Sequence, residues 1–201
     1  MAKFYFYYAA MNAGKTTLLL QSAYNYKERG MHTLLFTPAI DTRHAKGEIS
    51  SRIGLTEKAY SFEKNFDFYT YIKEVHAREP VACVFIDEAQ FLIRQQVDAL
   101  SEVVDRQHIP VLTYGLRSDF QGELFEGSAR LLTLADVLVE LKTICFCGHK
   151  ACMNMRLDAK GNPVREGEQI EIGGNERYIA VCRQHFKCSV NLSNSQKEKF
   201  Y

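Results

Sequence analysis

The chain has 201 residues, of which 46% are apolar and 24% charged, a composition typical of a soluble globular protein with one well-buried core and room for a small appendage. Its 25 basic and 24 acidic residues give a net charge of +1, which supplies no reason to expect a nucleic-acid partner or an anionic membrane surface. No apolar run approaches the ~20 residues that are needed to span a bilayer.

The first segment of the chain predicts a nucleotide-binding loop. An aromatic run at 4–8 is typical of a strand, and a helical pattern extends from Thr16 to about Arg29. A turn between them that ends in Gly14-Lys15-Thr16 directs backbone N–H groups and a helix N-terminus towards one point, where phosphate binds. Lys15 adds a positive charge, and Thr16 offers a hydroxyl to Mg²⁺. The predicted ATP-binding loop consists of Ala9, Ala10, Met11, Asn12, Ala13, Gly14, Lys15 and Thr16.

This segment has two further features. Ala9 stands where the full pattern G-x-x-x-x-G-K-[ST] has glycine, and its methyl group reduces backbone freedom without blocking the loop. The run after Lys3 also resembles a short signal peptide, but its removal would destroy the loop. We therefore expect it to be retained and the protein to be cytoplasmic. In that reducing compartment, the six cysteines favour metal binding or burial over disulfides.

Strands and helices are expected to alternate after the first helix. The predicted strands are 33–37, 81–86, 109–114 and 137–141, the predicted helices are 66–78 and 92–107, and the predicted loops are 41–51 and 115–127. This alternation indicates an α/β fold, a P-loop (RecA-like) parallel sheet flanked by helices. Near Thr143 the chain becomes rich in Cys, Gly and Asn. We therefore predict a nucleotide-binding domain at 1–143, a zinc-binding lobe at 144–188 and a polar, mobile tail at 189–201.

Two acids follow the buried strand at 81–86. Ligands lie at the carboxyl ends of parallel strands, so Asp87 and Glu88 are expected at the same edge as Lys15. An aspartate there can hold Mg²⁺. Neighbours on a strand face opposite ways, so Glu88 is expected to point away from Asp87 and to serve as a general base. The alternative interpretation is an ordinary cluster of acids that caps a helix.

Two cysteine-rich clusters in the lobe predict a structural zinc site. Cys145, Cys147, Cys182 and His185 supply three thiolates and one imidazole, which fit a closed tetrahedral site that cross-links a lobe with little core of its own. The first pair is C-x-C, tighter than the usual C-x₂-C. His149 or Cys152 therefore remain alternatives as ligands, and buried free cysteines remain the alternative to any metal.

With these features in place, the sequence resembles the type II thymidine kinases, the zinc-containing cytosolic family, and its bacterial members in particular. The resemblance extends from Phe4 to about His185, and each of its motifs is weak alone whereas the ordered set is specific. The motifs are Met11-Asn12-Ala13-Gly14-Lys15-Thr16, Asp41-Thr42-Arg43, Ile86-Asp87-Glu88-Ala89-Gln90-Phe91, Tyr114-Gly115-Leu116-Arg117 with Asp119-Phe120, and Ile172-Gly173-Gly174-Asn175-Glu176-Arg177-Tyr178 before Cys182.

The resemblance implies roles for further residues. Beyond the phosphate loop, ATP is expected to contact Asp41, Arg43, Asp87 and Gln90, with Thr16 and Asp87 at the Mg²⁺ and Glu88 as the catalytic base. Apolar groups that match the family's pocket for the base are Phe91, Leu116, Phe120 and Phe125. A lasso-like flap from the zinc lobe is expected to close over the nucleoside through Gln169, Ile172, Gly173 and Tyr178.

The implied reaction is transfer of the γ-phosphate of ATP to the 5′-hydroxyl of thymidine or deoxyuridine, which serves pyrimidine deoxynucleotide salvage. The family also implies a homotetramer and feedback inhibition by dTTP. Two other interpretations stay open: a P-loop ATPase that hydrolyses ATP without a nucleoside, and a zinc ribbon that binds nucleic acid. The second needs a basic surface, which the charge balance disfavours.

Overall fold

The structure, a computed structural model, describes residues 1–41, 47–170 and 177–188. Its centre is a sheet of six parallel strands in the order β5-β2-β6-β7-β1-β8. The strands are β1 (Phe4–Ala9), β2 (His32–Pro38), β5 (Tyr60–Phe62), β6 (Val81–Ile86), β7 (Val111–Leu116) and β8 (Val137–Glu140). The inner strands β6 and β7 are almost continuously apolar, as a sheet buried on both faces requires.

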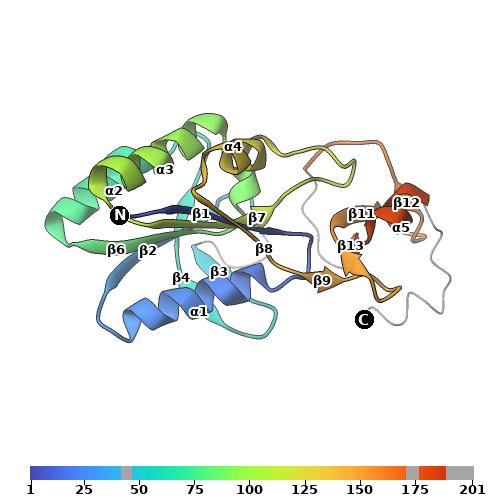
Figure 1. Ribbon diagram of the computed structural model, residues 1–201, viewed down its shortest axis with the longest axis horizontal. Coiled ribbons are helices and arrows are strands. Elements are labelled where there is room, and N and C mark those ends of the chain that lie inside the picture. Colours follow the sequence, from blue (N-terminus) through green and yellow to red (C-terminus); the bar gives the residue numbers. More distant parts are fainter. Residues whose placement is uncertain (42–46, 171–176, 189–201) are drawn as a thin grey trace.

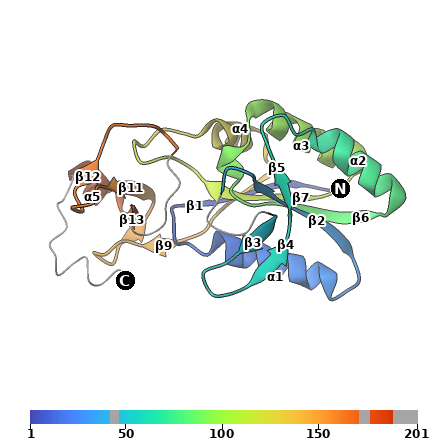
Figure 2. The same ribbon diagram turned by 180° about the vertical axis from the view of Figure 1, so that it is seen from behind.

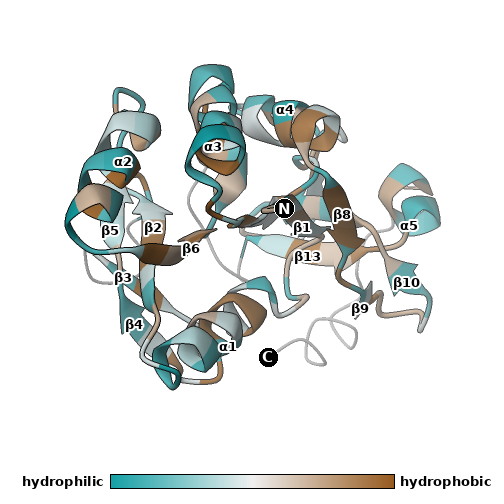
Figure 3. Cartoon of the chain, turned by 60° about the vertical axis from the view of Figure 1, so that its left-hand side comes forward, coloured by the Kyte–Doolittle hydropathy of each residue, from teal (hydrophilic) through white to brown (hydrophobic). Residues whose placement is uncertain are grey.

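Helices cover both faces of this sheet. On one face lies α1 (Lys15–Lys27), and on the other lie α2 (Phe68–Arg78), α3 (Arg94–Gln107) and α4 (Glu126–Leu134) (Figure 1). Strand β1 illustrates the division, because Phe4 and Phe6 pack into the core beneath α2 to α4, whereas Tyr7 packs on the α1 side. The apolar strands lie between helices whose outer surfaces are hydrophilic (Figure 3). Among the described residues, no helix is long and apolar enough to cross a membrane.

A small lobe extends from one end of the sheet (Figure 1). It contains an antiparallel sheet in the order β12-β11-β13, a two-stranded hairpin and a short helix. Its elements are β9 (Thr143–Ile144), β10 (Lys150–Ala151), β11 (Met153–Leu157), β12 (Pro163–Val164), β13 (Tyr178–Val181) and α5 (Arg183–Cys188). A separate antiparallel hairpin, formed by β3 (Glu48–Ser50) and β4 (Thr56–Lys58), lies beside α1 (Figure 2).

The predicted parallel α/β fold is confirmed, with local differences. The strand predicted at 109–114 runs from Val111 to Leu116, because Pro110 has no N–H to donate to the ladder. The helix predicted at 66–78 begins at Phe68, where the Asp67 side chain accepts a hydrogen bond from the Thr70 N–H. The loop predicted at 41–51 is wrong in part, because β3 occupies 48–50. The domain boundary near 143 stays a prediction, and the tail at 189–201 lies outside the described residues.

A close contact between α4 and the turn after β6 positions one wall of the cavity at the carboxyl edge of the sheet. The chain after β6 forms a 3₁₀ turn, η1 (Ala89–Phe91), which the sequence did not predict. At the start of α4, a Cβ on Gly127 would lie 2.5 Å from the carbonyl oxygen of Leu92 and 2.8 Å from that of Ala89. Only glycine permits this approach, which brings the rings of Phe91 and Phe125 to a centroid separation of 6.3 Å.

We expect Gly127→Ala to lower the free energy of unfolding by about 2 kcal/mol, because backbone oxygens cannot move aside as a flexible side chain would. The helix propensity gained by alanine, about 1 kcal/mol, offsets only part of this cost. Urea unfolding followed by circular dichroism would measure the change. Thr133→Ala, at an exposed position of the same helix, is the control and should stay within about 0.5 kcal/mol of the parent. Equal stability of both variants would contradict the close approach.

Candidate active site

A cavity of about 360 Å³ lies at the carboxyl edge of the sheet. The segments that surround it are the phosphate loop after β1, the end of β2 with Asp41, the hairpin segment 48–53, and the chain that follows β6 and β7. The lobe closes it with Asn154, Gln169 and Tyr178. The strand ends of a parallel sheet are the usual place for a ligand, and the volume falls in the range of small-molecule sites.

The predicted phosphate loop has the required geometry. Asn12 and Gly14 adopt left-handed backbone conformations, with φ of 62° and 73°, and Gly14 is the N-cap of α1. Such a loop points backbone N–H groups at the cavity beside the positive end of α1. Lys15 is 9% exposed and its Nζ donates a hydrogen bond to the carbonyl oxygen of Ala10 at 3.0 Å. The loop therefore offers an anion-binding site in which the ammonium group of Lys15 is already held in position.

Asp87 lines the cavity and is 5% exposed. Burial, and then the charge of Glu88, raise the pKa of Asp87 well above its usual range. The backbone N–H of Glu88, the hydroxyl of Thr16 and the charge of Lys15 act in the opposite direction. A buried carboxylate in this position is stabilised by a cation, and Thr16 with Asp87 provides the hard oxygen ligands that Mg²⁺ prefers. The residues present therefore fit a magnesium ion.

Glu88 reaches the cavity by a different route from the one that the sequence predicted. Strand β6 ends at Ile86, so strand alternation does not orient Glu88; its backbone is left-handed instead, with φ of 47°. Such a conformation is uncommon for a residue with a side chain and is frequent at functional sites. Gln90 holds the carboxylate in place, because its Nε2 donates to Glu88 Oε2 while its Oε1 accepts the N–H of Leu116 at 2.9 Å.

The other half of the cavity is apolar and aromatic. Phe91, Leu116, Phe120 and Phe125, all predicted from the resemblance, line it together with Tyr178. The guanidinium of Arg156 lies 3.7 Å from the ring centroid of Phe120, and its Nε donates to the Tyr178 hydroxyl at 3.0 Å. A flat, apolar ring with polar edges fits such a pocket.

Both ends of the predicted flap are tethered to this pocket. A second nitrogen of Arg156 donates to the carbonyl oxygen of Glu168 at 2.8 Å, so that one guanidinium joins Glu168 to Tyr178. Gln169 donates from Nε2 to Asp119 Oδ2 at 2.7 Å. Asp119 is itself fixed, because its other oxygen accepts the N–H groups of Gln121 and Glu123.

Most predicted site residues meet at this one cavity. Those that line it are Met11, Asn12, Ala13, Gly14, Lys15, Thr16, Asp41, Asp87, Glu88, Gln90, Phe91, Leu116, Phe120, Phe125, Gln169 and Tyr178. Ala9 and Ala10 are buried beside it rather than in its lining, and Arg43, Ile172 and Gly173 lie outside the described residues.

Among the polar residues that sequence reasoning missed at this site are Arg52, Asn154 and Arg156. Arg52, from the turn of the β3–β4 hairpin, lines the cavity and donates a hydrogen bond to Asn12 Oδ1. Asn154 also lines it, and Arg156 packs on its aromatic wall. The alternation of Asn154 and Arg156 with Met153, Met155 and Leu157 is a period-2 pattern that could have marked a strand with one polar face.

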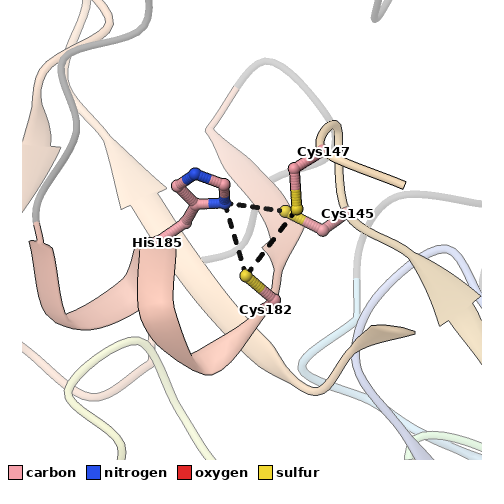
Figure 4. Close-up of side chains that lie close together, drawn as sticks. All are labelled: Cys145, Cys147, Cys182 and His185. Atoms are coloured by element: carbon pink, nitrogen blue, oxygen red, sulfur yellow. Dashed lines mark hydrogen bonds between the residues drawn. The ribbon is translucent and has the colours of Figure 1, made fainter. Parts of the chain in front are cut away.

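The predicted zinc ligands form a compact cluster in the lobe. Ligand atoms of Cys145, Cys147, Cys182 and His185 all lie within 4.8 Å of one another. Nδ1 of His185 is 3.3 Å from the sulfurs of both Cys145 and Cys182, and the sulfurs of Cys147 and Cys182 are 3.9 Å apart (Figure 4). Three thiolates and one imidazole are a normal donor set for structural zinc.

The surroundings of the cluster distinguish its ligands from the alternatives. The backbone N–H of His185 lowers the pKa of Cys182, which favours the thiolate that a metal requires, whereas burial raises the pKa of Cys145. The ring of Phe146 packs on His185 with centroids 4.3 Å apart and fixes the imidazole. His149 contacts one member of the cluster, with its Nδ1 3.3 Å from the Cys147 sulfur. Neither His149 nor Cys152 belongs to the group of four whose ligand atoms all lie within 4.8 Å of one another.

Comparison with known proteins gives a consistent result. The sequence profile of a family described as "Thymidine kinase" matches residues 2–186. The chain is 63% identical to the thymidine kinase of Legionella pneumophila (strain Paris) over 188 residues, which cover 93% of this chain and 90% of the relative. It is 60% identical to the thymidine kinase of Escherichia coli O157:H7 over 194 residues, 96% of this chain and 95% of the relative. A third relative, from Salmonella typhimurium, is 60% identical over 187 residues, 93% of this chain and 91% of its own length.

We expect purified protein to carry about one zinc ion per chain and His185→Asn to lose it, because the imidazole completes the tetrahedral set. Loss of the metal should also lower the unfolding temperature of the lobe. His149→Asn is the matched control and should retain both metal and stability. Elemental analysis of protein purified in reducing buffer would measure the zinc content. Loss of zinc in His149→Asn, with retention in His185→Asn, would reassign the fourth ligand.

Proposed function

The chain belongs to the thymidine kinase family, and on that premise we propose that it transfers the γ-phosphate of ATP to the 5′-hydroxyl of thymidine, giving dTMP and ADP. Deoxyuridine, which lacks only the methyl group of the base, is proposed as a second substrate. The observation that carries this proposal is one continuous cavity with a phosphate loop at one end, an aromatic pocket at the other and the Glu88 carboxylate in its lining. A phosphate donor and a nucleoside acceptor can meet in such a space.

The phosphate loop and its neighbours hold the donor in this proposal. Backbone N–H groups of the loop and the ammonium of Lys15 bind the phosphates, while Thr16 and Asp87 would hold Mg²⁺, which neutralises phosphate charge when it is bound. Asp41 lines the cavity near the loop and is proposed to act at the same end, with Gln90 behind the catalytic carboxylate. The proposed role of Arg43, stabilisation of the transferring group, rests on the family resemblance alone.

Glu88 is proposed to take the proton from the 5′-hydroxyl as that oxygen attacks the γ-phosphorus. Phosphoryl transfer has a loose transition state, so positioning and charge stabilisation supply most of the rate, and the base contributes by orienting and accepting one proton. The Gln90 amide supports this role, because its N–H donates to Glu88 Oε2 and so orients the carboxylate towards the cavity that it lines.

The aromatic pocket is proposed to bind the thymine ring. Phe91, Leu116, Phe120 and Phe125 provide flat apolar walls, and Tyr178 brings a wall from the zinc lobe. Gln169 begins the flap that is proposed to close over the nucleoside with Ile172 and Gly173. Zinc contributes indirectly in this scheme, because a small lobe cross-linked by a metal can hold the two flap ends at fixed positions.

The cellular setting is also proposed. We infer from the resemblance that the enzyme works in the cytoplasm as a homotetramer, in pyrimidine deoxynucleotide salvage, and that dTTP inhibits it. A cluster of three free cysteines and one histidine that could hold a metal suits a reducing compartment. A nearly balanced net charge supports the absence of a nucleic-acid partner.

The first test is nucleoside-dependent formation of ADP from Mg-ATP, with thymidine, deoxyuridine, deoxycytidine and deoxyguanosine supplied separately. We expect turnover with the first two only. Glu88→Gln should lower kcat by about 10²–10⁴-fold, because the amide keeps the contact with Gln90 but accepts no proton. Turnover without nucleoside would favour an ATPase instead, and full activity of Glu88→Gln would remove the base assignment while leaving the substrate assignment intact.

A second prediction concerns the flap tether. Arg156→Lys should raise KM for thymidine about tenfold and leave KM for ATP within about twofold, because lysine can neither bridge Glu168 and Tyr178 nor stack on Phe120 as a guanidinium does. Steady-state kinetics with each substrate varied in turn would measure the split. Arg165→Lys is the matched control, since Arg165 stacks on the Phe186 ring away from the cavity. Equal KM changes in both variants would indicate general loosening of the lobe.

A further inference from the structure

Strand β11 presents two different faces. Met155 and Leu157 point into the core of the zinc lobe, with Met153 packed against the same cluster. The alternate residues, Asn154 and Arg156, face the cavity side, and each is 3% exposed. Two buried polar side chains on one strand carry a desolvation cost, which is recovered only through well-placed hydrogen bonds. The partners of Asn154 therefore indicate what the residue is for.

Both polar atoms of the Asn154 side chain bond to backbone groups outside the lobe, in the part of the chain that carries the central sheet. Its Oδ1 accepts the N–H of Met11 at 2.8 Å, and its Nδ2 donates to the carbonyl oxygen of Ser118 at 2.9 Å. A backbone N–H can only donate and a carbonyl can only accept, so the orientation of the amide is determined. These two partners belong to the phosphate loop and to the segment after β7, far from Asn154 in the sequence.

Met11 is the residue at which the two halves of the cavity meet. Its backbone belongs to the phosphate loop. Its side chain packs in one buried cluster with Phe120 and Tyr178 of the aromatic half. The preceding residue, Ala10, is packed into the core of the zinc lobe. The Thr143 hydroxyl adds a third contact by donating to the carbonyl oxygen of Asn12 at 3.1 Å.

We propose that Asn154 is a positioning residue for phosphoryl transfer, which sets the position of the phosphate loop relative to the nucleoside pocket. This inference rests on the proposed function. The Asn154 amide holds the Met11 backbone and the Ser118 backbone at a fixed separation, and these two segments carry the phosphate-binding and base-binding groups respectively. In-line transfer requires the 5′-oxygen to reach the γ-phosphorus, and a displacement of about 1 Å between the two reactants can cost 10²-fold in rate.

This role predicts a specific kinetic signature. Asn154→Leu has nearly the same shape but leaves the Met11 N–H and the Ser118 carbonyl without these partners, so the phosphate loop is freed from the lobe. We expect kcat to fall about tenfold or more, because the relative position of the two sites matters only when both are filled. The dissociation constants for thymidine alone and for ADP alone, measured by calorimetry, should change less than about threefold.

Met155→Leu is the matched control. It is adjacent on β11, keeps its volume and faces the lobe core, so it reports any general effect of substitution in this strand. Both variants should retain zinc. A direct readout of the contact is amide hydrogen exchange, in which the Met11 N–H should exchange roughly tenfold faster in Asn154→Leu and at the parent rate in Met155→Leu.

The outcomes separate this inference from the proposed function. An active parent enzyme, with kcat lost in Asn154→Leu alone and both dissociation constants kept, supports the positioning role. Unchanged kcat, unchanged exchange at Met11, or equal losses in the control would overturn it while thymidine phosphorylation by the parent stands. A parent protein that exchanges as expected but does not phosphorylate thymidine would overturn the proposed function and, with it, the kinetic role of Asn154.

Discussion

The contact between the zinc lobe and the phosphate loop is the interaction on which the geometry of the cavity depends. The part of the chain that carries the central sheet presents Lys15, Asp87 and Glu88 and most of the aromatic pocket, and the lobe completes the cavity with Asn154, Gln169 and Tyr178. The lobe also contacts the phosphate loop directly: Ala10 is packed in the lobe core, and the Met11 N–H donates to Asn154. A phosphate loop that is usually supported by its own strand and helix is here also supported from outside.

The lobe can act as a support only if it is rigid, and its size makes this difficult. It consists of short strands of two to five residues and one helical turn and a half, so its apolar core is small and the usual source of rigidity is limited. A metal bound by Cys145, Cys147, Cys182 and His185 would join the start of the lobe to its end, a separation of 40 residues. The cost of ordering so long a segment is then met by ligand bonds rather than by buried area.

Sequence reasoning identified the parts of the site that are encoded locally. The phosphate loop, the acids after β6 and the cysteine clusters each occupy a few consecutive residues whose chemistry is visible in the sequence, and the apolar runs of β6 and β7 indicate a parallel sheet. The hairpin at 48–58 was missed because strands of three residues are too short to show a period. The left-handed backbone at Glu88 was missed because nothing in the residue type requires it; it occurs where the chain leaves β6 and enters the 3₁₀ turn η1, which the sequence did not predict. The sequence could assign no role to Asn154, because its partners are backbone groups of distant residues, and such groups do not depend on the type of side chain.

The buried polar residues of the lobe also explain why its cavity side is not simply apolar. A leucine at 154 or 156 would cost less to bury, yet it could not fix a direction, because apolar contacts tolerate sliding whereas a hydrogen bond to a backbone group defines both distance and angle. Arg156 illustrates the same principle at the flap, where one planar guanidinium sets Glu168, Tyr178 and the Phe120 ring at fixed positions. Since phosphoryl transfer depends mainly on alignment, polar side chains that fix alignment can matter to the rate although they touch no reacting atom. On this view the lobe contributes to catalysis through geometry, and a metal held by its Cys/His cluster would contribute by keeping that geometry constant.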